Sequence, residues 1–514
     1  MNTRTIETRV RNYLRNKVKK PGYITDEQYK KFYPNGTSVG VMYGLPKVHK
    51  SGAPLRPICS AVGTATYHLG QYLAEVIKPA SRNCHGTDIT STFTFVDQMK
   101  EVDLSNLHMV SYDVRSLFTN VPLNRTIDIC MDRMYRSDVI VPPTIPEDVL
   151  RKLITLSVCN NTFIFDGKVY EQIDGVAMGS SLGPVLANIW MTYLEEQHIL
   201  VSETSTQPVY YRRYVDDTFC LFNNSDDAQL FLGFINGLDP STQFDLEVES
   251  DNQLAFLDTI VSRVDRQQYP DISTRVKPTD KGLFYNFNSL IPNKYKGNLI
   301  GCLVYRIYHI ATDYRIFDLD IQKLRHKLLK NGFPFFFVDS QIGRVLSRLR
   351  DPPIPKDSGK TDVLIALPFL GPRSYVIKRR LVKLVSRFYP TIQLKVVFRR
   401  GFRIRNLFSF KDKFPLKCSS GVVYKISCKN CGPSQAYLGK TINTLHERFF
   451  GANGHLHPSS SNSALLKHMD ANPLCEFEFD SVEIIDKCNT DLKLRYMESK
   501  TLNTQEWSIP LNIM

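Results

Sequence analysis

The chain has 514 residues, 42% of them hydrophobic, and its 65 Lys and Arg exceed its 51 Asp and Glu to give a net charge of +14. This length allows two to four domains with real cores, and the cationic excess indicates a polyanionic partner, most simply nucleic acid. The sequence predicts no membrane span, since it has no apolar run of about 18 residues, and no signal peptide, and its eleven scattered cysteines favour a reducing compartment over a disulfide framework.

The predicted elements divide the chain into five regions. Residues 1–40 are a basic, helix-like extension, and residues 41–290 alternate short β-rich segments with helical ones, which predicts an α+β fold. Residues 291–350 read as a small helical domain, because apolar residues recur at helical spacing before the stop at Gly332. Residues 351–417 begin with a Pro- and Lys-containing linker, and residues 418–514 form a last compact domain.

The fourth region is strongly basic. Residues 373–417 hold 14 Lys or Arg against the single acid Asp412, with aromatic residues interleaved. A solvated basic face is one interpretation. The other is a nucleic-acid surface, where phosphates meet cations and bases can stack on aromatic rings.

Two stretches place carboxylates inside apolar, β-like runs. YRRYVDDTFCLF carries Asp216 and Asp217, and MVSYDVRSLFTNVPL carries Asp113. A hairpin tip would explain the Asp pair, because Asp is common in turns. The alternative is a metal site: carboxylates at two strand ends could hold two Mg²⁺ ions, which prefer oxygen ligands and assist in-line phosphoryl displacement.

Two further features suit a nucleotide. In GVAMGSSLGPVLANIWM, residues Ser180, Ser181 and Gly183 open a helix, where bare N–H groups and small side chains let a planar base approach the backbone. Upstream, YGLPKVHK and LRPICS supply Lys47 and Arg56, cations suited to a triphosphate. Each feature alone could equally be core or surface.

In this order the motifs GLPK, LRPI, SYDVRSLFTNVP, GVAMGSSLGPVLANI and YVDD resemble the reverse transcriptases, most closely those of Penelope-like retroelements. The resemblance implies a right-hand polymerase with fingers and palm over 41–290 and a helical thumb over 291–350. It implies that Asp113 and Asp216 bind both Mg²⁺ ions with the Val114 carbonyl, and that Asp217 supports them. Phe118 would exclude a ribose 2′-hydroxyl, with core packing as its alternative role. The other residues implied to bind the nucleotide are Lys47, Arg56, Ser180, Ser181 and Gly183.

The last region suggests a second chemistry. VVYKI and AYLGKT read as a hairpin carrying Tyr424 and Tyr437, and Thr444 with Glu447 is spaced as a capping box that sets Arg448 in the first turns of a helix. An Arg there is well placed for a phosphate. The pair Cys428-x-x-Cys431, followed by histidines, has zinc-ligand spacing, although reduced cysteines without metal are an alternative.

This region resembles the GIY-YIG endonucleases, which Penelope-like elements carry after their polymerase. The resemblance implies an α+β nuclease in which Tyr424 and Tyr437 help to activate water, Arg448 stabilises phosphate charge, Glu498 binds one Mg²⁺ and Asn512 matches a late Asn. It also implies a structural Zn²⁺ on Cys428, Cys431, His455 and His468. His457 and Cys418 are alternative ligands.

Together the two resemblances imply an RNA-directed DNA polymerase joined to a DNA endonuclease, acting by target-primed reverse transcription. The expected partners are element RNA, target DNA with its primer, and dNTPs, with no membrane. The expected place of action is the nucleus, after synthesis and RNA binding in the cytoplasm. The alternatives are a telomerase-like host enzyme and an inactive RNA-packaging protein. Region 1–40 is shorter than this family's N-terminal extension, so a truncated chain is also an expectation.

Overall fold

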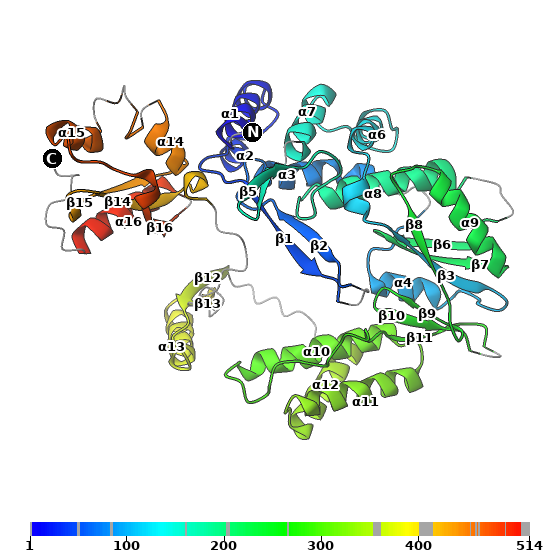
Figure 1. The fold of residues 1–514 in the computed structure, drawn as a ribbon. Coiled ribbons are helices and arrows are strands. Elements are labelled where there is room, and N and C mark those ends of the chain that lie inside the picture. The colour runs from blue at the N-terminus through cyan, green and yellow to red at the C-terminus, as the bar shows by residue number, and fades with distance from the viewer. Residues whose placement is uncertain are drawn as a thin grey trace. The chain divides into compact units, whose positions relative to one another are not determined.

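The computed structural model describes residues 3–48, 52–82, 86–159, 162–201, 206–264, 267–352, 361–399, 415–452, 454–457, 460, 463–488 and 490–504. The chain divides into two compact units, one comprising Met1–Thr279 with Lys411–Met514 and the other Asp280–Phe410. Helices and strands occur throughout, so the mixed α+β class predicted from the sequence is confirmed (Figure 1). No helix within the described ranges is long and apolar enough to cross a membrane.

The first unit begins with helical segments and a small sheet. A capping box starts the third segment, since the Thr25 and Gln28 side chains each accept a hydrogen bond from the other residue's N–H. The sheet has the strand order β2-β1-β4-β5, and β1 pairs antiparallel with β2 and parallel with β4. These elements are α1 (Thr3–Tyr13), η1 (Leu14–Lys19), α2 (Asp26–Phe32), β1 (Gly40–Pro46), β2 (Leu55–Ser60), β4 (Thr162–Phe165) and β5 (Lys168–Glu171).

A second four-stranded sheet, of order β6-β7-β3-β8 and antiparallel throughout, is backed by three helices (Figure 1). Its strands are β3 (His108–Val114), β6 (Tyr210–Tyr214), β7 (Asp217–Phe222) and β8 (Phe244–Val248), and the helices are α6 (Leu123–Tyr135), α8 (Gly183–Leu194) and α9 (Ser225–Gly237). Buried and partly exposed residues alternate along β6, as expected when one face packs on a core. In that core, Tyr112 of β3 donates a hydrogen bond to the Ala228 carbonyl of α9 at 2.9 Å.

A three-stranded antiparallel sheet, of order β11-β10-β9, follows the four-stranded one. Phe95 joins the two sheets, because its ring lies 5.2 Å from that of Phe219 in β7 and 4.7 Å from that of Phe256 in β9. The remaining elements before residue 280 are α3 (Tyr67–Ile77), η2 (Lys78–Ser81), α4 (Thr92–Met99), α5 (Leu117–Asn120), α7 (Glu147–Val158), η3 (Glu195–Ile199), β9 (Gln253–Phe256), β10 (Thr259–Ser262) and β11 (Asp271–Thr274).

The second unit contains the three helices α10 (Asn293–Ile310), α11 (Tyr314–Lys330) and α12 (Phe335–Arg350), which occupy the predicted helical region. Their apolar stripes share one core that includes Ile300, Leu324, Leu328 and Val338. Helix α11 ends where Gly332 adopts a φ of +78°, a left-handed conformation that glycine permits at no steric cost.

Beyond these helices the structure differs from the expected linker and basic region. Residues 361–399 form a βαβ unit in which β12 (Thr361–Pro368) and β13 (Ile392–Arg399) pair in parallel around α13 (Arg373–Phe388). The physical reason is that both strand segments are rich in β-branched and apolar residues, whereas the intervening segment repeats its apolar residues at helical spacing. Most of the linker, residues 353–360, lies outside the described ranges.

The C-terminal region of the first unit is a three-stranded antiparallel sheet of order β15-β14-β16 with three helices. Its elements are η5 (Leu416–Cys418), β14 (Val422–Cys428), β15 (Gly432–Thr441), α14 (Leu445–Phe450), α15 (Ala464–Ala471), η6 (Phe479–Ser481), β16 (Glu483–Lys487) and α16 (Asp491–Thr504). The expected hairpin is present, because Tyr424 of β14 pairs with Gly439 of β15. The predicted capping box is half formed: the Thr444 side chain accepts a hydrogen bond from the Glu447 N–H and so starts α14.

Candidate functional sites

Three carboxylates meet at one end of the β6-β7-β3-β8 sheet. Asp113, next to last in β3, pairs in register with Asp217, the first residue of β7. Because Tyr214 pairs with Asp217 across the β6–β7 hairpin, Val215 and Asp216 are its two turn residues. The Val114 N–H donates to the Asp216 carbonyl at 3.1 Å. The Asp pair is thus at a hairpin tip and also beside Asp113, so the two interpretations of the sequence are compatible.

The electrostatics of this cluster favour binding of a cation. The pKa of Asp217 is raised to about 6, mainly by burial and then by the negative charges of Asp216 and Asp113. The positive charges of Arg275 and Lys277 limit this increase. Like charges that raise a carboxyl pKa would be relieved by a hard divalent cation, which takes oxygen ligands. The donor set therefore fits Mg²⁺, with Asp113 and Asp216 as the carboxylates at the strand end and the turn.

The segment expected to receive the nucleotide packs against Phe118 of α5, the short helix that follows β3. The Val176 N–H donates to the Phe118 carbonyl at 2.7 Å, and a Cβ on Gly183 would lie 3.7 Å from the Phe118 ring. Phe118 is partly buried and contacts the core, so both of its expected roles fit its position. Gly183 begins α8, and Ser180 and Ser181 immediately precede that helix.

Two backbone contacts connect this segment to β2. The Cys59 N–H donates to the Met178 carbonyl at 2.8 Å, and a Cβ on Gly179 would lie only 2.4 Å from the Cys59 carbonyl oxygen. Glycine is required at that position for steric reasons.

The two expected triphosphate cations lie on the β1–β2 hairpin. Arg56 of β2 pairs with Leu45 of β1, and the Lys47 N–H donates to the Pro54 carbonyl at 2.9 Å. Both positions are toward the end of the hairpin where its residues become exposed. The structure therefore brings Lys47 and Arg56 to one end of the β1–β2 hairpin.

In the C-terminal region, the predicted catalytic side chains converge on Arg448. Its Nε donates to the Tyr424 hydroxyl at 3.1 Å and its Nη2 to the Tyr437 hydroxyl at 3.5 Å. Burial raises the pKa of Tyr437, the Arg448 charge lowers it, and the nearby Glu498 carboxylate raises it. Burial also raises the pKa of Glu498, against the charges of Lys440 and Arg448. These four side chains form one partly buried site, and Asn512 lies outside the described residues.

Gly439 makes this convergence possible. A Cβ at that position would lie 2.6 Å from the Tyr437 ring and 2.8 Å from the Tyr424 hydroxyl. Any other residue would push the two rings apart, which is the steric reason for glycine after Tyr437 and Leu438.

The structure differs from the sequence expectation at His455. Its Nε2 lies 2.8 Å from the Tyr424 hydroxyl, and its ring lies 4.8 Å from that of Tyr437, so it belongs with the tyrosine–arginine site and outside the cysteine cluster. The reason is a turn after α14, in which the His455 N–H donates to the Arg448 carbonyl and returns the chain to that site. The spacing of the histidines in the sequence does not predict this turn, so it could not show that His455 lies next to Tyr424.

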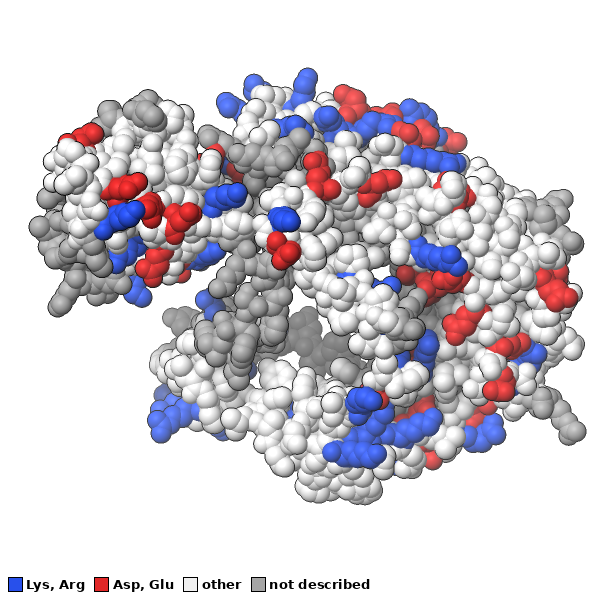
Figure 2. Space-filling model, in the orientation of Figure 1, with Lys and Arg blue, Asp and Glu red and all other residues white. Residues whose placement is uncertain are grey.

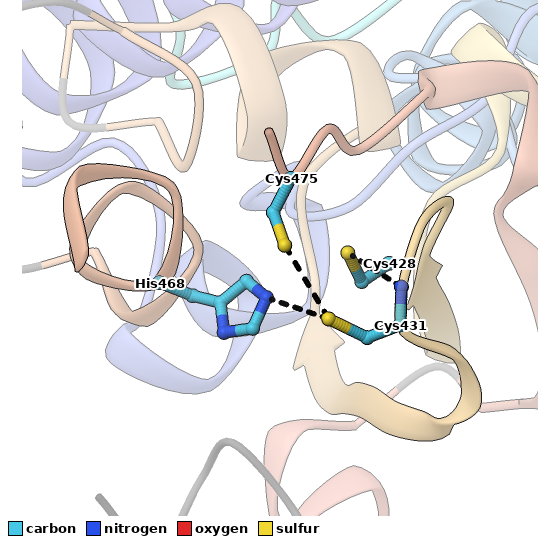
Figure 3. Close-up of side chains that lie close together, drawn as sticks. All are labelled: Cys428, Cys431, His468 and Cys475. Atoms are coloured by element: carbon cyan, nitrogen blue, oxygen red, sulfur yellow. Dashed lines mark hydrogen bonds between the residues drawn. The ribbon is translucent and has the colours of Figure 1, made fainter. Parts of the chain in front are cut away.

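Cys475 takes the place expected for His455 (Figure 3). The ligand atoms of Cys428, Cys431, His468 and Cys475 all lie within 4.8 Å of one another. Cys431 Sγ is 3.3 Å from Cys475 Sγ and 3.7 Å from His468 Nε2. Three sulfurs and one imidazole at such distances suit tetrahedral Zn²⁺, and neither His457 nor Cys418 is in the group. The sequence feature that could have indicated this ligand is the presence of a third cysteine, Cys475, downstream of the Cys-x-x-Cys pair.

The thiol of Cys428 has a lowered pKa, which favours metal binding. Burial alone would raise the pKa of Cys428, but hydrogen bonds from the Cys431 backbone N–H and from His468 bring it down to about 6. A thiolate is the form that binds zinc.

Purified protein is expected to contain one zinc ion on these four residues. Cys475→Ser should lose the metal and lower the unfolding temperature of the C-terminal region, because structural zinc contributes folding free energy directly. Metal content by mass spectrometry and unfolding with and without a zinc chelator would measure both effects. Cys488→Ser is the matched control and should retain the zinc. Retention of zinc by Cys475→Ser, with its loss in His455→Gln, would show that the ligand set is the one expected from the sequence.

His455 should make the C-terminal sheet sensitive to acid. Burial, with the nearby Arg448 charge, lowers its pKa from 6.5 to about 3. The unfolded state therefore binds more protons between these values, so the stability present above pH 6.5 falls as the pH drops, by up to about 1.4 kcal/mol per unit. Hydrogen exchange of the β14 amides, corrected for intrinsic rates, should show protection falling from pH 7 to 5. His455→Gln should flatten this dependence, whereas His446→Gln on the exposed face of α14 should preserve it.

Comparisons with known proteins give partial matches. Residues 283–343 match the family model described as an animal helix-turn-helix domain, which covers α10, α11 and part of α12. No curated protein matches the chain. Similar solved structures include telomerase from Candida albicans in complex with a fragment of telomeric RNA, at 11% identity over 67% of this chain and 65% of that one with a TM-score of 0.39.

Others are apo telomerase from Candida tropicalis, at 12% identity over 66% of this chain and 63% of that one with a TM-score of 0.37, and the sicinivirus 3Dpol RNA-dependent RNA polymerase. The latter has 15% identity over 62% of this chain and 71% of that one, with a TM-score of 0.38. The chain spans less than two thirds of the length of the two telomerases.

Proposed function

We propose that this protein is a retroelement RNA-directed DNA polymerase that also carries a DNA endonuclease. The observation that carries the polymerase assignment is the register of Asp113 against Asp217 with Asp216 in the adjoining turn. Asp217, whose carboxyl pKa is raised by burial and by the neighbouring charges of Asp216 and Asp113, is costly to a fold, so its presence supports a metal-dependent nucleotide site.

In this proposal, Asp113 and Asp216 hold two Mg²⁺ ions, which supply charge neutralisation at the transferring phosphoryl group. Asp217 adds negative potential behind them. Phe118, in α5 and next to Gly183 at the start of α8, lies under the sugar, and Ser180, Ser181 and Gly183 line the base. Lys47 and Arg56 receive the triphosphate from the fingers hairpin. The protein's own contribution is positioning and electrostatics, which dominate phosphoryl transfer.

The proposed endonuclease site is the cluster around Arg448. The guanidinium donates to two tyrosine hydroxyls and can turn its positive charge to a scissile phosphate. Glu498 would hold one Mg²⁺, and Tyr424 would take a proton from water as its own hydroxyl proton passes to His455 Nε2, which lies 2.8 Å away. This supports a phosphodiesterase separate from the polymerase carboxylates.

The basic helix α13 is a proposed nucleic-acid surface. It carries six Lys or Arg and no acid, and its residues facing β13 include the half-buried Leu381, Val382 and Val385, so most of its cations point to solvent. Figure 2 shows blue side chains gathered over α13 and also over α11 and α12. Such one-sided charge suits a phosphate backbone, and binding through it should weaken steeply with salt.

The two sites together suit target-primed reverse transcription in the nucleus: the endonuclease nicks DNA, and the polymerase extends the new 3′ end along bound element RNA. The test combines purified protein, Mg²⁺, dNTPs, an RNA template and a supercoiled plasmid. Nicked plasmid covalently joined to complementary DNA is the expected product. Primed extension without nicking would favour a telomerase-like enzyme, and RNA binding without either reaction would favour a packaging protein.

A further inference from the structure

A fully buried arginine lies directly behind the catalytic turn. Arg213, in β6, is 1% exposed, and its partner Glu195 is 0% exposed. Arg213 Nη2 donates to Glu195 Oε2 at 3.0 Å, Nε donates to the other carboxylate oxygen, and the Tyr211 hydroxyl also donates to Glu195 at 2.9 Å. Isolated buried ion pairs add little to stability, so their presence calls for another explanation, such as fixing one conformation.

The guanidinium joins three parts of the polymerase region. Its Nη1 donates to the Val215 carbonyl at 3.1 Å and to Asn188 Oδ1 of α8 at 2.7 Å. Its Nη2 reaches Asp88 at 2.8 Å, and the Arg213 backbone pairs with the same segment through Thr87 and Ile89. One side chain therefore connects the Val215–Asp216 turn, the helix that follows the proposed nucleotide segment, and the strand-like segment around Asp88.

The turn needs such a support. Val215 has a φ of +58°, a left-handed conformation that is strongly disfavoured for a β-branched residue, whereas hairpin turns with positive φ at this position normally use glycine. Strain of this kind persists only when surrounding contacts determine it. Two contacts hold the backbone of the turn: Arg213 donates to the Val215 carbonyl, and the Val114 N–H donates to the Asp216 carbonyl.

We infer that Arg213 is a positioning residue of the polymerase site, which holds the Val215–Asp216 turn so that the Asp216 carboxylate faces Asp113 and couples that turn to α8 through Asn188. This inference rests on the proposed polymerase function. Arg213 does not reach substrate, since its side chain is enclosed. Its effect is transmitted through the peptide between Val215 and Asp216, and it should appear as a change in metal affinity.

The test compares two variants of the full chain. Arg213→Lys keeps the charge, but a single ammonium group cannot replace the planar fork that serves Glu195, Asp88 and the Val215 carbonyl together. Thr192→Val is the matched control, because it removes the 3.3 Å contact to Nη2 and a 3.4 Å hydrogen bond to the Ser81 carbonyl, and leaves the Arg213 contact to the Val215 carbonyl in place. If Arg213→Lys does not fold, the double variant Arg213→Met with Glu195→Gln takes its place in the comparison, because it removes both charges of the buried ion pair at once.

Each variant is assayed for Mg²⁺ dependence of primer extension, for primer–template affinity and for unfolding temperature. Arg213→Lys should raise the Mg²⁺ concentration for half-maximal extension about tenfold with primer–template affinity unchanged, and excess Mg²⁺ should restore part of the rate. Thr192→Val should leave the Mg²⁺ dependence as in the starting protein even where its unfolding temperature falls. A drop in unfolding temperature in both variants with no change in Mg²⁺ dependence would assign Arg213 a structural role and overturn the inference.

Direct metal binding separates this inference from the proposed function. Mn²⁺ titrations followed by electron paramagnetic resonance, with Glu498→Gln present throughout, report the carboxylate cluster without the nuclease carboxylate. Protein that extends no primer overturns the polymerase proposal. Even then, weaker Mn²⁺ binding in Arg213→Lys than in Thr192→Val supports the positioning role, and equal binding overturns it.

Discussion

Asp216→Asn is expected to reduce RNA-templated primer extension by at least about 1000-fold, the loss of roughly 4 kcal/mol of transition-state stabilisation. The change keeps the size of the side chain and its place in the β6–β7 turn, so the fold should be preserved. What it removes is one of the two carboxylates proposed to hold the divalent ions. Single-nucleotide extension under single-turnover conditions, with template binding measured separately, is the appropriate assay.

Asp226→Asn is the matched control. It makes the same chemical change in the first turn of α9, at an exposed position, and should leave extension within about twofold while costing a few tenths of a kcal/mol of helix stability. Extension retained in Asp216→Asn would remove this residue from the proposed metal site. Nicking should be the same in both variants, because the side chains of the proposed endonuclease site come from other strands and helices.

Glu498→Gln is expected to reduce plasmid nicking by about 1000-fold while extension of a supplied primer continues at the normal rate. Glu498 is half-buried in α16, its carboxylate raises the pKa of Tyr437, and the proposal places it at the same phosphate as Arg448. The amide has the same shape and cannot serve as an anionic metal ligand. Conversion of supercoiled to nicked plasmid over time gives the rate.

Glu483→Gln, on the exposed face of β16, is the control for this change and should nick at the normal rate. Loss of both nicking and extension in Glu498→Gln would contradict separable sites and would indicate that the substitution disturbs the whole chain. Zinc content should stay at the starting value, since Glu498 is not in the cysteine–histidine group.

Much of this architecture follows from local patterns. The apolar spacing in residues 293–350 specifies three helices, because each turn of a helix places residues three and four apart on one face. The YVDD tetrapeptide between two apolar β-like runs indicates a hairpin tip, and Thr444 indicates the start of α14. These features depend on interactions within a few residues, so the sequence expresses them directly.

The local pattern of residues 361–399 does not specify their βαβ unit, because basic residues dominate the composition of this segment. The six cations of α13 indicate a basic surface, yet this helix lies between two β-prone segments that pair with each other in parallel. Parallel pairing joins segments separated by a whole helix, and no short-range pattern specifies it.

By itself, then, the sequence determined the α+β class, the helical region, the acidic hairpin tip and the Cys-x-x-Cys turn. Only the tertiary structure decided that Asp113 faces Asp217, that Arg213 is buried beneath the turn, and that Cys475 joins the cysteine cluster while His455 contacts Tyr424. The reason is physical. Helix periods, caps and turns arise from neighbours in the chain, whereas strand register, the burial of an arginine and the choice between two possible metal ligands depend on how distant segments pack together.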